Sequence, residues 1–318
     1  MRYVVYGAGA VGGVVGGTLT LAGHAVTLVA RGAHLEAIRA QGLVLDTGDG
    51  RHRIVAPATD TAAEVAWTDD TVVLLAVKSH QAAVALADLR AHAPADVPVV
   101  CLTNGIATET AALRLFARTY AVCVMLPATH LEPGVVVASC HPTPAILDIG
   151  RFPNGTDATT AAVAADLRSA GIASDERADI MAMKRRKLVM NLGNGVDASF
   201  AQGDAADELA ERAQEEGERV LAAAGFTVVS AEADRERRGS ILRRRTDLER
   251  RGGSTWQSLT RATGDSEIDY LAGEIVLQGR LHGVPTPVND AVVAATRHLA
   301  ATGGAPRSLD AAEVLARL

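Results

Sequence analysis

The stretch RYVVYGAGAVGG at residues 2–13 constrains the fold of this chain more than any other. It joins an apolar run of strand length directly to glycines spaced as GxGxxG. In a strand-to-helix turn, the first glycine permits a tight bend, the second lets a pyrophosphate approach the backbone, and the third lets the helix pack on the strand. The N–H groups at the start of the helix then favour phosphate. The residues predicted to hold a dinucleotide are Gly7, Ala8, Gly9, Ala10, Val11 and Gly12.

Further apolar runs support this interpretation, because a bare GxGxxG is a weak signal. AVTLV, TVVLLAV and VPVVCL follow within the first 120 residues and alternate with helical patterns, which is typical of a parallel, doubly wound sheet. Residues 120–150 contain three short β-rich pieces, predicted to add antiparallel strands at the sheet edge, and a helix is predicted over 158–169. We therefore expect an α/β chain, with a Rossmann-type domain over 1–175 and an all-helical domain over 176–318.

Composition excludes several classes of function. The 318 residues carry a net charge of −6, which argues against a nucleic-acid or membrane-surface protein. Eight arginines in the segment 234–251 alternate with four acids and no aromatic, so a solvated or mobile helical face is favoured there over a nucleic-acid site. Three cysteines without metal-ligand spacing predict no metal. The absence of a leader pattern and of an apolar span predicts a cytoplasmic location.

The second strand ends in Arg31-Gly32, where NAD-binding folds place an acid for the ribose 2′-hydroxyl. Arg31 can instead pair with a 2′-phosphate, which favours NADPH, although a surface arginine is an alternative. Lys78 and Asn104 follow the next two strands of this sheet. Ligands lie beyond the carboxyl ends of such strands, so both side chains are candidates for the cofactor crevice, or are ordinary loop residues.

The stretch KLVMNLGNG at 187–195 places unusual residues in a helical pattern. Lys187, Asn191 and Asn194 share one stripe with Ala198, and Val189, Leu192 and Val196 share another that is predicted to pack inward. A stripe that only faces water would carry long charged side chains, whereas short amides beside glycine suit a face that a ligand approaches.

A second polar group lies further along the chain. Ser254 and Thr255 follow Gly252-Gly253, and Glu267 opens an apolar helical run. Glu267 also fits a plain capping role at the start of a helix. The residues alone leave both interpretations of Glu267 open.

Taken together, these motifs resemble the ketopantoate reductase (2-dehydropantoate 2-reductase) family. The matching pieces are GAGAVGG, Arg31-Gly32, AVKSHQ, TNG, KLVMN, STWQSL and SEIDYLAGEIVLQGRLHGVPTPVN. They run in family order from residue 1 to about 300, and the EIDYLAGEI…GVPTPVN pattern is the most specific of them.

The resemblance implies an enzyme in which NADPH reduces a small 2-oxo acid bound between the two domains. It implies that Lys187 is the catalytic acid, that Glu267 holds the nascent hydroxyl, and that Asn191 contacts substrate. Asn104 would bridge cofactor and substrate, with Arg31 and Lys78 along the cofactor. The other implied substrate contacts are Asn194, Ser254 and Thr255. A homodimer is compatible with this assignment.

Three positions depart from the family pattern: Gly195 stands where a second substrate asparagine is usual, and Trp256 and Leu259 replace a methionine and an aspartate. We expect these changes to lie in the substrate pocket. They leave two alternatives, a reductase of another branched or bulkier 2-oxo acid and a non-catalytic NADPH-binding sensor. Retention of both Lys187 and Glu267 counts against the sensor, because pure binding needs neither.

Overall fold

The computed structural model describes residues 1–249, 252–260 and 266–318. Their contacts divide the chain into two compact units. The first unit contains Met1–Thr103, Thr108–Met181 and Glu232–Leu248, and the second contains Asn104–Ala107, Ala182–Ala231 and Glu249–Leu318. Residues 104–107 therefore belong to the second unit and residues 232–248 to the first. A single boundary, such as 175/176, does not describe this division. Within the described ranges, no helix has both the length and the apolar character needed to cross a membrane.

A seven-stranded sheet forms the centre of the first unit, in the order β11-β8-β7-β6-β1-β2-β5. Its strands are β1 (Arg2–Tyr6), β2 (Ala25–Val29), β5 (Ala58–Thr59), β6 (Thr71–Leu75), β7 (Val99–Cys101), β8 (Thr119–Met125) and β11 (Ile146–Arg151). All neighbours are parallel except β11, which pairs antiparallel with β8. The first strand lies between β2 and β6, where Val4 is in register with Thr27 and Val73. The predicted fold class is confirmed.

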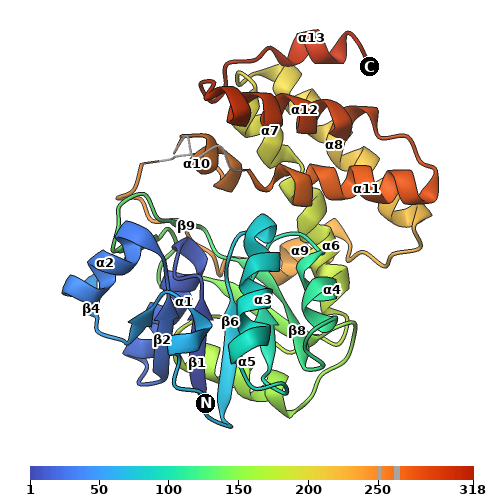
Figure 1. Ribbon diagram of the computed structural model, residues 1–318. Coiled ribbons are helices and arrows are strands. Elements are labelled where there is room, and N and C mark those ends of the chain that lie inside the picture. The colour runs from blue at the N-terminus through green and yellow to red at the C-terminus, as the bar shows by residue number, and fades with distance from the viewer. Residues whose placement is uncertain (250–251, 261–265) are drawn as a thin grey trace. The chain divides into compact units, whose positions relative to one another are not determined.

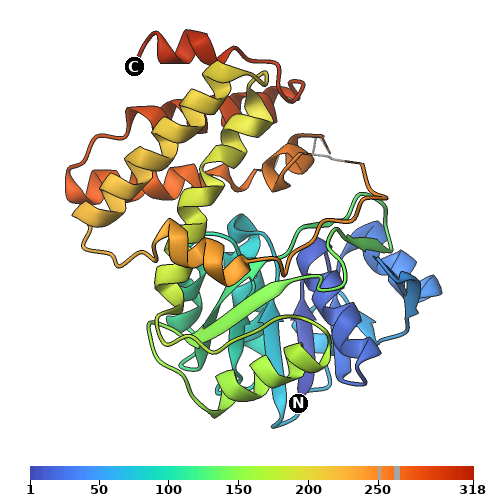
Figure 2. The same cartoon turned by 180° about the vertical axis from the view of Figure 1, so that it is seen from behind.

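Helices cover both faces of this sheet, which explains the continuously apolar strands. Val5 of β1 packs in the hydrophobic cluster of one face, and Val4 packs in the cluster of the other. The first face carries α1 (Ala10–Leu21) and α5 (Ala158–Ser169), which lie in front of the sheet in Figure 2. The other carries α3 (Ala82–His92) and α4 (Thr108–Leu113), in front in Figure 1. Further short helices of this unit are η1 (Ala62–Glu64) and η2 (Ser79–Gln81).

The helix predicted over 158–169 is present as α5. Asp157 caps it, because its carboxylate accepts hydrogen bonds from the N–H groups of Thr159 and Thr160, and the Thr160 hydroxyl accepts one from the Asp157 N–H. Such a reciprocal cap satisfies N–H groups that the first helical turn leaves without partners.

A second sheet in the first unit shows where the sequence prediction for residues 120–150 was wrong. Its order is β4-β3-β10-β9. The strands are β3 (Leu43–Thr47), β4 (Gly50–Ile54), β9 (Ala128–Thr129) and β10 (Val135–Ala138). Of the predicted antiparallel additions, β8 is parallel to β7, β10 belongs to this separate sheet, and β11 alone is an antiparallel edge strand. Val136 of β10 packs against Gly13 of α1, so the second sheet supports the helix that follows the glycine motif.

The arginine-rich segment belongs to the first unit up to Leu248, and the predicted solvated face is present for part of it. Arg235, Arg243 and Arg244 are exposed, whereas Arg237 and Arg245 form ion pairs within the fold. In α9 (Ala231–Arg238), Arg237 donates two hydrogen bonds, of 2.8 and 2.6 Å, to the carboxylate of Asp148, which is 1% exposed. Arg245 donates to Asp46 at 2.8 Å and to Asp247 at 2.7 Å. These pairs neutralise arginines within the fold. Residues 250–251 of the segment lie outside the described part.

The second unit is helical, as predicted. Its helices are α6 (Ile180–Asn191), α7 (Gly193–Ser199), α8 (Asp204–Ala223), α10 (Ser254–Thr260), η3 (Glu267–Tyr270), α11 (Ala272–His282), α12 (Pro287–Thr302) and α13 (Ala311–Leu315). The buried carboxylate of Glu216 in α8 accepts hydrogen bonds from the N–H groups of Val288 and Asn289, in the first turn of α12. A carboxylate there is stabilised by the helix dipole. This contact gives the GVPTPVN motif a structural role.

Candidate functional site

The glycine motif forms a tight turn between β1 and α1 with one open position. Gly7 has a φ of +105°, and a Cβ there would lie 2.8 Å from Cγ1 of Val77. A Cβ at Gly12 would collide with the carbonyl oxygen of Gly7, whereas a Cβ at Gly9 would meet nothing within 4 Å. The start of α1 has no side-chain cap and no acid in its first turn. An open backbone with uncapped N–H groups fits a dinucleotide pyrophosphate.

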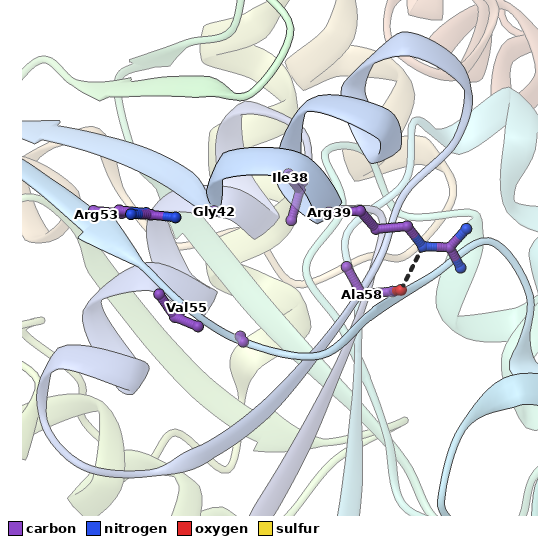
Figure 3. Close-up of a pocket in the computed structure, with 7 residues that line it drawn as sticks. Ile38, Arg39, Gly42, Arg53, Val55 and Ala58 are labelled. Atoms are coloured by element: carbon purple, nitrogen blue, oxygen red, sulfur yellow. Dashed lines mark hydrogen bonds between the residues drawn. The ribbon is translucent and has the colours of Figure 1, made fainter.

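Arg31 follows β2 and is the N-cap residue of α2 (Gly32–Gln41). It lines a surface pocket of about 560 Å³ together with Gly32, Leu35, Glu36, Arg39, Asp60 and Thr61. Arg39 also lines a smaller pocket of about 240 Å³, in which its Nε donates to the carbonyl of Ala58 at 3.0 Å (Figure 3). Arg31 therefore lies in a hollow at the carboxyl end of β2, where Rossmann folds hold the adenosine ribose.

Lys78 and Asn104 lie in different units. Lys78 precedes η2, just beyond the end of β6 in the first unit. Asn104 follows β7, but its segment Asn104–Ala107 belongs to the second unit. Gly105 explains that association, because its φ is +73° and a Cβ there would lie 2.6 Å from the carbonyl oxygen of Tyr270. The unit that contains Lys187 and Glu267 thus also contains Asn104.

The predicted helix through KLVMNLGNG is broken at Leu192. The N–H of Leu192 donates to the carbonyl of Val189, three residues back, at 3.1 Å, and α7 starts afresh at Gly193. Asn194 lies beside Asn191, as residues three apart on a helix do, and Asn194 Nδ2 donates to Asn191 Oδ1 at 3.3 Å. The two amides, three residues apart, therefore form one polar surface one helical turn beyond Lys187.

The inward stripe of this stretch is confirmed. Val189, Leu192 and Val196 are buried. Ala198 is also buried, so it does not continue the polar stripe as predicted.

Packing of Gly195 places Glu267 next to α7. A Cβ at Gly195 would lie 2.7 Å from Cγ1 of Val292 and 2.8 Å from Cδ1 of Ile268. Ile268 directly follows Glu267, whose side chain is 7% exposed. The hydroxyl of Ser266 accepts a hydrogen bond from the Ile268 N–H at 3.2 Å and so caps η3. Ser266 thus fills the capping role that Glu267 was considered for.

Thr255 brings an unsatisfied hydroxyl to the same region. It is 2% exposed, and its Oγ1 has no hydrogen-bond partner among the described residues. Its helix α10 packs on α7, and the Cβ position of Gly253, just before Ser254, lies 3.4 Å from Oδ1 of Asn194. A buried polar atom without a partner is costly in a folded chain, which makes Thr255 a candidate ligand-binding residue.

Trp256 and Leu259 pack in one hydrophobic cluster with Ala198 and Leu299. The guanidinium of Arg307 lies 5.9 Å from the centroid of a Trp256 ring. These replacements therefore contribute to packing between α10 and α12, and their expected place in the substrate pocket stays a prediction.

Sequence reasoning missed a pair that holds α10 in place. Asp197 of α7 accepts hydrogen bonds from the N–H of Gly253 at 3.4 Å and from Arg307 at 2.7 Å. The two side chains are 110 residues apart and belong to no recognised motif, so no signal in the sequence pointed to them. Among the described residues, no group of three histidines, cysteines or acids is arranged to hold a metal ion.

Comparison with known proteins assigns both parts of the chain to one family. The description "Ketopantoate reductase PanE/ApbA" matches residues 3–154, and "Ketopantoate reductase PanE/ApbA C terminal" matches residues 179–300. A 2-dehydropantoate 2-reductase of Halobacterium salinarum is 30% identical over 299 residues, which cover 91% of this chain and 95% of the relative.

Solved structures agree with this assignment. A ketopantoate reductase of the same family from Ralstonia eutropha JMP134 has a TM-score of 0.81 and 28% identity, over 95% of this chain and 99% of that one. A D-mandelate dehydrogenase solved with NADH and anilino(oxo)acetate also has a TM-score of 0.81, over 95% and 99% of the two chains. Its identity of 23% shows a shared fold alone.

Proposed function

The chain belongs to the ketopantoate reductase family, and we propose that it reduces 2-dehydropantoate to pantoate with NADPH. The observation that carries the proposal is the packing of Gly195 on Ile268, which places α7, directly after the helix of Lys187 and Asn191, against the short helix that contains buried Glu267 in the same unit. A cation, a carboxylate and an amide on neighbouring elements are the groups that carbonyl reduction needs.

NADPH, the cofactor of this family, supplies a hydride when bound. The N–H groups at the start of α1 hold its pyrophosphate, and the open face at Gly9 lets the phosphates approach. Arg31 pairs with the 2′-phosphate through its planar guanidinium. Lys78 lies along the phosphates, and Asn104 contacts cofactor and substrate.

Lys187 acts as the general acid. Addition of hydride to the 2-keto carbon leaves negative charge on its oxygen, which the Lys187 ammonium stabilises before it donates a proton to form the hydroxyl. The lysine then regains a proton from water. Such a group contributes about 10²–10⁴-fold to a rate.

The remaining polar groups orient the substrate. Glu267 accepts a hydrogen bond from the nascent hydroxyl, and Asn191 and Asn194 donate to the substrate from their shared surface. Thr255 Oγ1 gains from the substrate the partner that it lacks among the described residues. Ser254 adds a second hydroxyl at the start of α10.

An assay of NADPH oxidation with a panel of 2-oxo acids tests the proposal, with wild type and Lys187→Ala in parallel. We expect 2-dehydropantoate to be the best substrate, and the variant to lose about 10²–10⁴-fold in kcat. The panel also includes a bulkier aromatic 2-oxo acid. Preference for that compound over 2-dehydropantoate would contradict the substrate assignment. Tight NADPH binding without turnover of any 2-oxo acid would identify a sensor, and turnover that survives Lys187→Ala would contradict the mechanism.

We further propose that the enzyme works in the cytoplasm. A homodimer stays a prediction, which analytical ultracentrifugation checks directly. The substrate is a small molecule, and neither nucleic acid nor a membrane is a proposed partner.

A further inference from the structure

We propose that His34 positions the phosphate-binding turn by fixing the peptide group between Ala8 and Gly9. It is a positioning residue, and the proposal rests on the assignment of this turn to NADPH binding. His34 lies in α2, three residues after Arg31, and none of the motifs described above includes it.

The two ring nitrogens of His34 have different partners on opposite sides. Nε2 lies 2.7 Å from the carbonyl oxygen of Ala8, and Nδ1 accepts a hydrogen bond of 2.8 Å from the N–H of Gly134. A neutral imidazole has one N–H and one lone pair. The two contacts therefore specify a neutral ring with its proton on Nε2, so that Nε2 donates to Ala8.

This donation determines where the N–H of Gly9 points. A peptide group is planar and trans, so its C=O and N–H point in opposite directions. The N–H of Ala8 donates to the carbonyl of Val29 at 3.0 Å, and its carbonyl accepts from His34, so the residue is held on both sides. The N–H of Gly9 therefore points away from His34, on the opposite side of the peptide group from the Ala8 carbonyl.

The loop between β9 and β10 holds the histidine in place. A Cβ at Gly134 would lie 2.9 Å from Cβ of Ala37 in α2, so this glycine permits the close approach that its N–H needs. The ring of His130 packs on that of His34 with centroids 4.1 Å apart, and His130 Nδ1 donates to the carbonyl of Val135 at 3.0 Å. The imidazole thus links the pyrophosphate turn, the helix that starts after Arg31, and the second sheet.

Two substitutions separate the two contacts. The amide nitrogen of glutamine reaches the position of Nε2, so His34→Gln keeps the donor to Ala8. The amide oxygen of asparagine reaches the position of Nδ1, so His34→Asn keeps the acceptor for Gly134 and loses the donor. We expect His34→Asn to weaken NADPH binding about 3–10-fold in fluorescence titrations, and His34→Gln to stay within about twofold of wild type.

NADH distinguishes this role from that of Arg31. The pyrophosphate is common to both nucleotides, so His34→Asn should raise the Kd of NADH and of NADPH by the same factor. Arg31→Ala should raise the Kd of NADPH alone. With saturating NADPH, kcat and the KM for the 2-oxo acid should be unchanged in both His34 variants.

Thermal unfolding of each variant is measured as well, so that weaker nucleotide binding can be told apart from a loss of folded protein. Equal weakening by glutamine and asparagine, or asparagine binding that matches wild type, would overturn the role of His34 and leave the proposed function intact. Failure of the wild type to bind either nucleotide would overturn the proposed function, and this inference with it.

Discussion

Gly195 and Ile268 approach so closely that a Cβ on the glycine would lie 2.8 Å from Cδ1 of the isoleucine. Any side chain there would have to displace Ile268 Cδ1 and Val292 Cγ1, so this position favours glycine over the asparagine that is usual in the family. Asn194 lies beside Asn191, as residues three apart on a helix do, and its amide donates to that of Asn191. The chain thus has a pair of amides, Asn191 and Asn194, and has a glycine, Gly195, where α7 contacts Ile268 and Val292.

Gly195→Ala should therefore disturb both stability and catalysis. Overpacking against Val292 and Ile268 should lower the free energy of unfolding by about 1–3 kcal/mol, measured by urea denaturation. Because Ile268 adjoins Glu267, kcat/KM should also fall by roughly 10-fold through misplacement of that carboxylate.

Gly193→Ala is the matched control, since the nearest side-chain atom to its Cβ is 3.6 Å away. It should leave stability unchanged or raise it by up to about 1 kcal/mol. Equal effects of the two substitutions would contradict this account.

Thr255→Val should separate stability from substrate binding. Removal of a buried hydroxyl without a partner should leave the free energy of unfolding unchanged or raise it by about 1 kcal/mol. The same change should raise the KM for the 2-oxo acid about 2–10-fold, and Thr255→Ser should not. Thr296→Val provides the contrast, because that buried hydroxyl lies 2.9 Å from the hydroxyl of Ser199. Its loss should destabilise the protein by about 1–3 kcal/mol. An unchanged KM in Thr255→Val would remove Thr255 from the site.

Arg237→Met should be among the most destabilising single changes in the first unit. It leaves the Asp148 carboxylate buried without the guanidinium that donates to both of its oxygens. Breaking a buried ion pair costs about 3–5 kcal/mol, and Arg177, which stays 3.6 Å from the carboxylate, should keep the loss toward the lower end of that range in chemical denaturation. Arg280→Met, at an exposed pair with Asp290, should have a much smaller effect. The double variant Arg237→Met with Asp148→Leu should recover most of the loss, and no recovery would contradict the explanation.

His34 should make stability depend on pH in a defined direction. Burial lowers its pKa below the ordinary value of 6.5, assisted by the facing His130 and opposed by the hydrogen bond to Ala8. As pH falls, the unfolded chain therefore takes up the proton first. The stabilisation is complete above about pH 6.5 and is lost as pH falls below it toward the lowered pKa. Replacement by glutamine should flatten the stability profile in that range, and an unchanged slope in thermal unfolding would count against the pKa shift.

The sequence predicted the central sheet well because the signals there are local. The apolar runs that became β1, β2, β6 and β7 are each complete in a few residues, and the GxGxxG follows the first of them directly. The helix α5 was found for the same reason. Continuous apolar strands are typical of burial on both faces, so these runs and the GxGxxG turn together led to the fold class.

Features that depend on distant partners were not predictable. Val44 of β3 pairs with Val135 of β10, far along the chain, and neither strand alone reveals the other. The break at Leu192 arises within an otherwise helical pattern, so sequence periodicity carried the helix through it. Lys187 and Asn191 were singled out by their helical spacing and Glu267 by its place at the start of a helical run, and their roles were inferred from the family resemblance. His34 became evident only from its two partners in the fold.

The return of residues 232–248 to the first unit also bears on how such proteins can be recombined. The two parts of the chain match separate family descriptions, as if they were interchangeable modules. Asp148 and Arg237 lie on opposite sides of any junction near residue 180, although they form one buried pair. A chimera joined at such a point inherits a carboxylate from one parent and depends on the other parent for its arginine. Exchange of the helical part is therefore expected to succeed only between relatives that share this pair.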